Sequence, residues 1–187
     1  LLENKEIMLI GSGPGVKKHR AAIESYIQKA RPLVIALNAK SSINNDLIDL
    51  RIACHPIRLK TDCEKLSNLS KPVIMPASSM PMHVLDLLSS IEILDFGLNI
   101  KDGELVYEKT YCVLSSPLVI GYALAIATSG KAKRLLLAGF DGYSSDNPLR
   151  LESELIFQAH QSIKSATPLL AVTPTLFSIE STSIYSM

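Results

Sequence analysis

Short apolar runs alternate along the chain with longer segments whose apolar residues recur at helical spacing. The run Ile7–Ile10 is followed by Lys17–Ala30, where Ala22, Ile23, Tyr26 and Ile27 fall on one side of a predicted helix. The same reading predicts further strands at Leu33–Leu37, Leu50–Cys54, Pro72–Met75, Ile91–Leu94, Arg134–Ala138 and Leu169–Val172. It predicts further helices at Arg58–Leu66, Met82–Leu88, Leu118–Thr128 and Leu149–Ser162.

Strands that alternate with helices indicate parallel pairing through right-handed crossovers. We therefore expect an α/β fold: a three-layer Rossmann-like domain with a mostly parallel, doubly wound sheet and helices on both faces. A small hairpin insertion is predicted where Lys101-Asp102-Gly103 turns the chain between Leu98–Ile100 and Leu105–Tyr107. The helix Leu118–Thr128 is apolar on nearly every side, which predicts a buried position.

The chain has 187 residues, which fits one Rossmann-like domain spanning 1–187. It begins Leu1-Leu2 and not with methionine, so we expect a fragment of a longer protein. Apolar residues make up 47% and charged residues 20%, enough for a substantial core, and the net charge of +1 gives no field that favours nucleic acid or an anionic membrane. The longest apolar stretches are too short to span a bilayer. Three scattered cysteines without metal-ligand spacing indicate a reducing, cytoplasmic location and no metal site.

The glycine-rich turn after the first strand is the strongest candidate for a binding site. Its residues are Gly11, Ser12, Gly13, Pro14 and Gly15. Glycines allow a tight turn and a close approach of the backbone to an anion, and the helix that follows points its positive end at the same place. The GxGxG spacing departs from the dinucleotide fingerprint, so it favours a nucleotide phosphate site over a standard NAD site. The alternative is a tight strand-to-helix turn without a ligand.

Other polar residues follow the predicted strands, at the edge where doubly wound sheets bind ligands. Asn38 could bond a ribose or a base, or only form a turn. Asp141, between Gly139 and Gly142, could meet a ligand hydroxyl or bond its own loop. The further candidates in this set are His55, Ser115, Ser116, Tyr143, Thr173 and Thr175. The two serines stand before the buried helix, where their hydroxyls could cap it or face a phosphate.

Candidate catalytic groups are few. His55 and Asp141 are the side chains that could act as a general base. The P-loop, the nucleophile elbow, the HExxH motif and paired cysteines are all absent from the sequence. Hydrolase and zinc-site chemistry are therefore disfavoured.

The chain resembles a C-terminal domain of aldolase-type proteins, hydroxymethylglutaryl-CoA lyase-like or 4-hydroxy-2-oxovalerate aldolase-like, from bacterial surface-polysaccharide gene clusters. The resemblance rests on IGSGPGVKKH (10–19), VIALN (34–38), ACHPIRL (53–59), EILDFGL (92–98), the segment 111–143 and AVTPTLFSI (171–179). It implies an upstream aldolase-like barrel as partner, and a divalent metal only in that barrel.

A more distant similarity is to the nucleotide-binding core of bacterial sialyltransferases and of motility-accessory and pterin pyrophosphokinase-like proteins. It implies nucleotide contacts from Gly11, Ser12, Gly13, Pro14, Asn38, Ser115 and Ser116, with Asp141 and Tyr143 beside them. The chain departs from the sialyltransferase pattern at Gly15, where those enzymes have serine, and at Ser116-Pro117 in place of Ser-Gly. It also has no clear counterpart of their catalytic histidine.

Three functions are compatible with these residues. The first is a module that binds a nucleotide or nucleotide sugar for the upstream barrel, with no other cofactor in this fragment. The second is a glycosyltransferase that uses a CMP- or other nucleotide-activated sugar, with His55 or Asp141 as the base. The third is a ligand-free scaffold or homo-oligomerisation unit.

Overall fold

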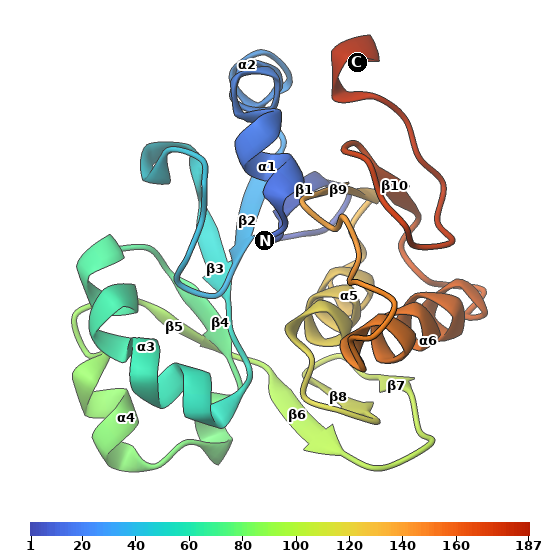
Figure 1. Ribbon diagram of the computed structural model, residues 1–187. Helices are drawn as coiled ribbons and strands as arrows, with labels where there is room; N and C mark the ends of the chain where they lie inside the picture. Colours follow the sequence, from blue (N-terminus) through green and yellow to red (C-terminus); the bar gives the residue numbers. More distant parts are fainter.

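The computed structural model of the chain describes residues 1–187 and is organised around a seven-stranded parallel sheet (Figure 1). The strand order is β10-β9-β1-β2-β3-β4-β5. These strands are β1 (Glu6–Ile10), β2 (Leu33–Leu37), β3 (Leu50–Ile52), β4 (Val73–Met75), β5 (Ile93–Asp95), β9 (Arg134–Ala138) and β10 (Leu169–Ala171). The helices are α1 (Pro14–Lys18), α2 (Arg20–Ala30), α3 (Pro56–Leu69), α4 (Met82–Leu87), α5 (Val119–Ser129) and α6 (Leu149–Gln161). Single 3-10 turns are η1 (Asn45–Leu47), η2 (Ala77–Ser79) and η3 (Ile184–Ser186).

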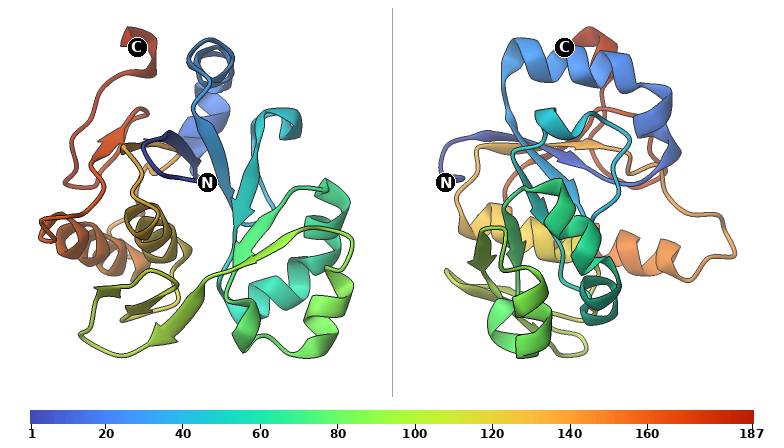
Figure 2. Two further views of the ribbon diagram at one scale, coloured as in Figure 1. Left: turned by 180° about the vertical axis from the view of Figure 1, so that it is seen from behind. Right: turned by 90° about the vertical axis from the view of Figure 1, so that its left-hand side faces the viewer.

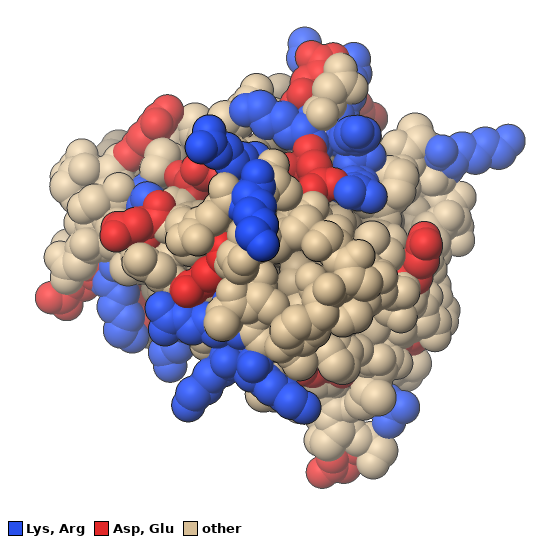
Figure 3. Space-filling model, turned by 90° about the horizontal axis from the view of Figure 1, so that it is seen from above, with Lys and Arg blue, Asp and Glu red and all other residues tan.

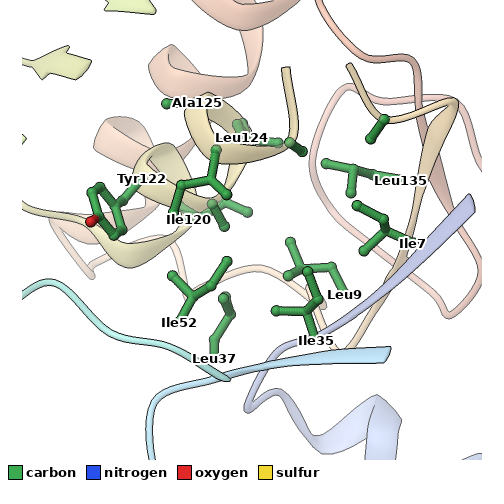
Figure 4. Packing of buried hydrophobic residues seen from close by; sticks show 14 of the residues in the cluster. Ile7, Leu9, Ile35, Leu37, Ile52, Ile120, Tyr122, Leu124, Ala125 and Leu135 are labelled. Atoms are coloured by element: carbon green, nitrogen blue, oxygen red, sulfur yellow. The ribbon is translucent and has the colours of Figure 1, made fainter. Parts of the chain in front are cut away.

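The sheet lies between two layers of helices, as Figure 2 shows for α2 on one face and α5 and α6 on the other. Alternate residues of one strand serve the two faces because side chains point to opposite sides of a strand. Met8 and Ile10 pack with α1 and α2, whereas Ile7 and Leu9 pack with α5. Figure 4 shows the core on the α5 face of the sheet, where side chains of the strands pack against α5. The labelled residues include Ile7, Leu9, Ile35, Leu37, Ile120 and Leu124. The expected three-layer, doubly wound α/β fold is confirmed.

The helix α5 is the buried helix that its composition predicts. Every residue from Ile120 to Ala127 is buried, which is what an element apolar on all sides requires. The phenol of Tyr122 donates a hydrogen bond to the carbonyl of Phe96 and so satisfies its one polar group. Burial raises the pKa of Tyr122, and the hydroxyl remains a neutral donor.

The first crossover is broken into two helices, where the sequence predicts one. The chain enters α1 at Pro14 and leaves helical geometry at His19, whose φ of −108° and ψ of 19° separate α1 from α2. Proline is favoured in the first turn of a helix because its missing N–H is not needed there. The helix start therefore lies directly behind the glycine turn, closer to it than the apolar spacing indicated.

The predicted hairpin between Leu98–Ile100 and Leu105–Tyr107 is wrong. β6 (Gly97–Ile100) pairs in parallel with β8 (Tyr111–Leu114), and β7 (Val106–Tyr107) pairs antiparallel with the other edge of β8. The turn at Lys101-Asp102-Gly103 does form, with Gly103 at a φ of 71°. The strand β8, which the sequence reading missed, lies between the two segments, and the true hairpin is β7-β8.

Charged groups are spread over the surface. In the view of Figure 3, basic and acidic side chains are interspersed and a broad area carries neither. This distribution agrees with a net charge of +1. No helix is both long and apolar enough to cross a membrane.

Candidate functional site

A cavity of about 330 Å³ opens at the carboxyl edge of the sheet, between the ends of β1, β2 and β9. We call it the cleft. The connection that leaves β1 runs to α1 and α2 on one face, whereas β9 leads to α6 on the other, so the cleft lies at the switch point of the sheet. It is lined by Gly11, Ser12, Gly13, Pro14, Leu37, Asn38, Leu118, Val119, Ile120, Gly139, Phe140, Asp141, Gly142, Tyr143, Ser153, Phe157 and Phe177.

The glycine turn is packed tightly against the loop that follows β9. The backbone N–H of Gly11 donates to Ala138 at 2.8 Å and that of Gly13 donates to Gly139 at 3.0 Å. A Cβ atom at either glycine would lie 2.6 Å from the carbonyl oxygen of Gly139. The two loops can approach this closely only because these positions have no side chain.

The carboxylate of Asp141 lies at the start of α1. Its Oδ1 accepts a hydrogen bond of 2.8 Å from the backbone N–H of Gly15. Its Oδ2 is buried without a hydrogen-bond partner, in the space where a Cβ of Gly13 would stand. An anion at a helix start is favoured by the free N–H groups and the helix dipole. The protein supplies that anion itself.

This arrangement corrects the expectation that the turn presents its N–H groups to a phosphate. The N–H groups of Gly11, Gly13 and Gly15 are all used within the protein, and Gly15 does not line the cleft. Proline has no N–H at position 14. Ser12, exposed at the mouth of the cleft, is the turn residue whose N–H and hydroxyl have no partner in the chain.

Asn38 projects from the end of β2 into the cleft wall. Its backbone is left-handed, with a φ of 60°, a conformation that asparagine tolerates better than most residues. Its N–H donates to Ile52 and its carbonyl accepts 2.8 Å from the guanidinium of Arg51. The turn that places Asn38 is thus held from both sides.

Arg51 was not predicted as part of the site. It is 1% exposed. It lies beside the connection between β2 and β3, which has the short 3-10 turn η1 and no α-helix. Its guanidinium also donates to the carbonyl of Ala39 at 3.1 Å and to Oδ1 of Asn45 at 2.9 Å, and no carboxylate pairs with it. Burial lowers the pKa of Arg51. The sequence feature that could have identified it is a charged residue within a predicted strand of otherwise apolar residues.

Two threonines that follow β10 bond the loop that follows β9. The buried hydroxyl of Thr173 accepts from the N–H of Gly139 at 2.9 Å, and that of Thr175 donates to the carbonyl of Phe140 at 2.6 Å. Neither threonine lines the cleft. Both therefore hold the loop that carries Asp141 and Tyr143.

Ser115, Ser116 and His55 do not line the cleft. The cap position of α5 belongs to Leu118, so the interpretation in which the serine hydroxyls cap this helix is wrong. Ser115 instead donates to the carbonyl of Glu104 at 3.4 Å. His55 begins α3 without a side-chain capping bond. These three residues are thus separate from the cleft, whereas Leu118 and Val119, further along the chain after β8, line it.

None of the three cysteines lines the cleft, and all are buried. Burial raises the pKa of Cys54 and of Cys112 to about 12, so both thiols stay protonated at neutral pH. No three His, Cys, Asp or Glu side chains are grouped to hold a metal ion.

A second cavity, of about 520 Å³, adjoins the cleft and shares Gly142, Tyr143 and Phe177 with it. Its other walls are mainly polar and come from the loop before α6, from α6 and from the last segment of the chain. They include Asp146, Asn147, Arg150, Glu154, Gln158 and Ser178. Tyr143, 38% exposed, stands at the junction of the two spaces.

Comparison of the chain with known protein-family models and with curated proteins found no match.

Proposed function

We propose that the cleft binds a nucleotide or nucleotide sugar, within a domain that serves a larger aldolase-type protein of surface-polysaccharide metabolism. The observation that carries this proposal is the position of the cleft at the switch point between β1 and β9. Ligands of open α/β sheets bind in this crevice. The apolar wall from Leu118 to Ile120 and the amide of Asn38 supply the mixture of surfaces that such a ligand needs.

The phosphate would lie at the mouth of the cleft, beside Ser12. The hydroxyl and N–H of Ser12 are free, whereas the start of α1 already holds the carboxylate of Asp141. A second anion at that helix start would meet like charge at close range. The site proposed here therefore differs from a phosphate cradle built on the glycine N–H groups.

The sugar of a nucleotide sugar would extend past Tyr143 into the second cavity. Hydroxyl groups both donate and accept, so a sugar needs both kinds of partner. Arg150 and Gln158 offer donors there, and Asp146 offers an acceptor. The ring of Tyr143 gives an apolar surface for the sugar ring.

The hydrogen bonds and positions of the two candidate bases, Asp141 and His55, favour a binding function over a catalytic one. Asp141 has one oxygen bonded to Gly15 and the other buried against Gly13. His55 is off the cleft wall. A general base must reach the proton that it removes, and neither group is directed at a ligand in the cleft.

Calorimetric titration with CMP, CDP, UDP and their sugars tests the proposal. We expect at least one of these ligands to bind, and we expect Val119→Phe, which fills the cleft, to abolish that binding. The matched control is Ile57→Phe, which places the same ring on an exposed site outside the cleft. Absence of binding at millimolar concentration, or binding that Val119→Phe leaves intact, would contradict the proposal.

A ligand-free scaffold is the second candidate, because the hydrogen bonds of the glycine turn are already satisfied within the chain. Substitution of Gly13 does not separate the two candidates. A Cβ there would lie 2.1 Å from Oδ2 of Asp141, with or without a ligand. A stable oligomer in sedimentation, together with no nucleotide binding, would favour the scaffold.

A further inference from the structure

The inner wall of the cleft is aromatic. Phe157 of α6 is fully buried and packs against two other rings of the wall. Its centroid is 6.5 Å from that of Phe140, edge to face, and 4.9 Å from that of Phe177. These rings come from three separate segments of the chain, and Phe157 holds the other two in place. The result is an apolar surface that lines the same cleft as the start of α5.

One polar side chain stands on this apolar wall. Ser153 lies one helical turn before Phe157 on the buried side of α6, and it lines the cleft. The residue is 3% exposed, and its hydroxyl, which bonds no group of the protein, keeps a small accessible surface and is not among the fully buried unpartnered atoms. A serine in a helix can bond the carbonyl four residues earlier, as Ser162 does with Gln158, but Ser153 does not.

A hydroxyl that is largely buried and has no partner in the chain loses part of its hydration, a cost that an apolar residue would avoid. Alanine would fit the same helix position and has a higher helix propensity. The hydroxyl is therefore poorly explained by folding alone. Its position on the cleft wall offers a partner from outside the chain.

We infer that Ser153 is the specificity-determining group for the planar heteroaromatic base of the ligand; this inference rests on the nucleotide binding proposed above. A sugar would leave most of its hydroxyl groups unpaired on a wall with one polar group, whereas a base has flat apolar faces and a few polar edge atoms. The base packs beside Phe140 and Phe177, and the Ser153 hydroxyl bonds one atom of its edge. The phosphate then points towards Ser12 and the sugar towards Tyr143.

The test compares the affinities of CMP, UMP, AMP, GMP and ribose 5-phosphate for the wild-type protein, Ser153→Ala and Ser12→Ala. A lost hydrogen bond corresponds to a weakening of about 3- to 10-fold. We expect Ser153→Ala to weaken the preferred nucleotide by that factor, to change the ranking of the bases and to leave ribose 5-phosphate unchanged. Ser12→Ala, at the exposed mouth of the cleft, is expected to weaken all five ligands to a similar extent.

The possible failures are distinct. If the wild-type protein binds none of the five, the proposed function fails and this inference fails with it. If nucleotides bind and Ser153→Ala changes none of their affinities, or lowers all of them equally with ribose 5-phosphate, only the inference about Ser153 is overturned. Circular dichroism and the thermal midpoint of each variant verify that it is folded. Ser153→Thr, which retains the hydroxyl, should keep the ranking of the bases.

Discussion

The carboxylate of Asp141 accepts a hydrogen bond of 2.8 Å from the backbone N–H of Gly15, and so joins the loop after β9 to the helix that follows β1. The two residues are far apart in the sequence, and they meet because β1 and β9 are neighbours in the sheet. A sequence motif typical of phosphate binding is thus occupied by an internal anion. The glycines at positions 13 and 15 make room for that carboxylate.

This contact predicts that substitutions of Gly15 and Asp141 change the free energy of unfolding in a strongly non-additive way. The three atoms nearest to a Cβ at Gly15 all belong to the Asp141 carboxyl group, the nearest at 2.6 Å. Gly15→Ala should therefore destabilise the protein by about 1–3 kcal/mol, as overpacking usually does. In an Asp141→Ala background the same change should be neutral or stabilising by up to about 1 kcal/mol, because alanine favours a helix.

Urea unfolding of the four proteins in this cycle measures the coupling free energy, which we expect to exceed about 1 kcal/mol. Gly121→Ala is the control, because its Cβ would meet neighbours at 3.4 Å or more inside α5. A Gly15→Ala penalty that persists without Asp141 would show that the glycine serves another purpose.

The fold was readable from the sequence because it depends on local patterns. Apolar runs bounded by helical segments gave the seven strands of the main sheet, and the strand-end rule brought Gly11, Asn38 and Asp141 to one cleft. The strand β8 was missed because the small sheet does not follow the order of the sequence. β8 lies between two short strands, pairing in parallel with β6 and antiparallel with β7.

The failures at the site have a common physical cause. Whether a polar residue meets a ligand or the protein depends on contacts between distant segments, which local periodicity does not contain. The carboxylate of Asp141 bonds Gly15, whereas the hydroxyl of Ser153 bonds no group of the chain. Ser153 could have been singled out as a polar residue on the buried side of an amphipathic helix, but the sequence does not show what lies opposite it.

Arg51 is predicted to be essential for the wall that carries Asn38. Arg51→Met keeps most of the apolar stem but leaves the carbonyls of Asn38 and Ala39 and Oδ1 of Asn45 without their donor. Removal of the buried charge offsets part of this loss, so we expect destabilisation by about 2–4 kcal/mol. Urea unfolding measures it, with the exposed Arg58→Met as control. A change below about 0.5 kcal/mol would contradict this role.

Ser153→Ala should increase the stability of the ligand-free protein. The change removes a largely buried hydroxyl that has no partner in the chain and introduces a better helix former, which together should add about 0.5–1 kcal/mol. Thermal unfolding measures the gain. Ser162→Ala is the comparison, because the hydroxyl of Ser162 donates to the carbonyl of Gln158 at 2.9 Å and its loss should give no comparable gain. Destabilisation by Ser153→Ala would indicate that the hydroxyl has a structural partner.

His160 makes the stability of the protein depend on pH. The side chain is 1% exposed, and burial lowers its pKa from the usual 6.5, an effect that the carbonyl of Thr167 partly opposes. A carbonyl can only accept, so Nε2 carries the proton and donates to Thr167 at 2.9 Å. Nδ1, 3.2 Å from the phenol of Tyr107, then accepts from that hydroxyl. The folded protein therefore holds a neutral imidazole with both nitrogens paired.

Because the folded pKa lies below the unfolded one, the unfolded chain binds a proton more readily as the pH falls below about 6.5. Stability should be highest above that pH and should decrease between the unfolded pKa and the folded one. Burial also raises the pKa of Tyr107, so the phenol stays neutral throughout this range. Urea unfolding at several pH values between about 5 and 8 should show the decrease in the wild-type protein and a flatter profile in His160→Gln. The exposed His83→Gln should follow the wild-type profile, and a His160→Gln profile that also follows it would assign the pH dependence to other groups.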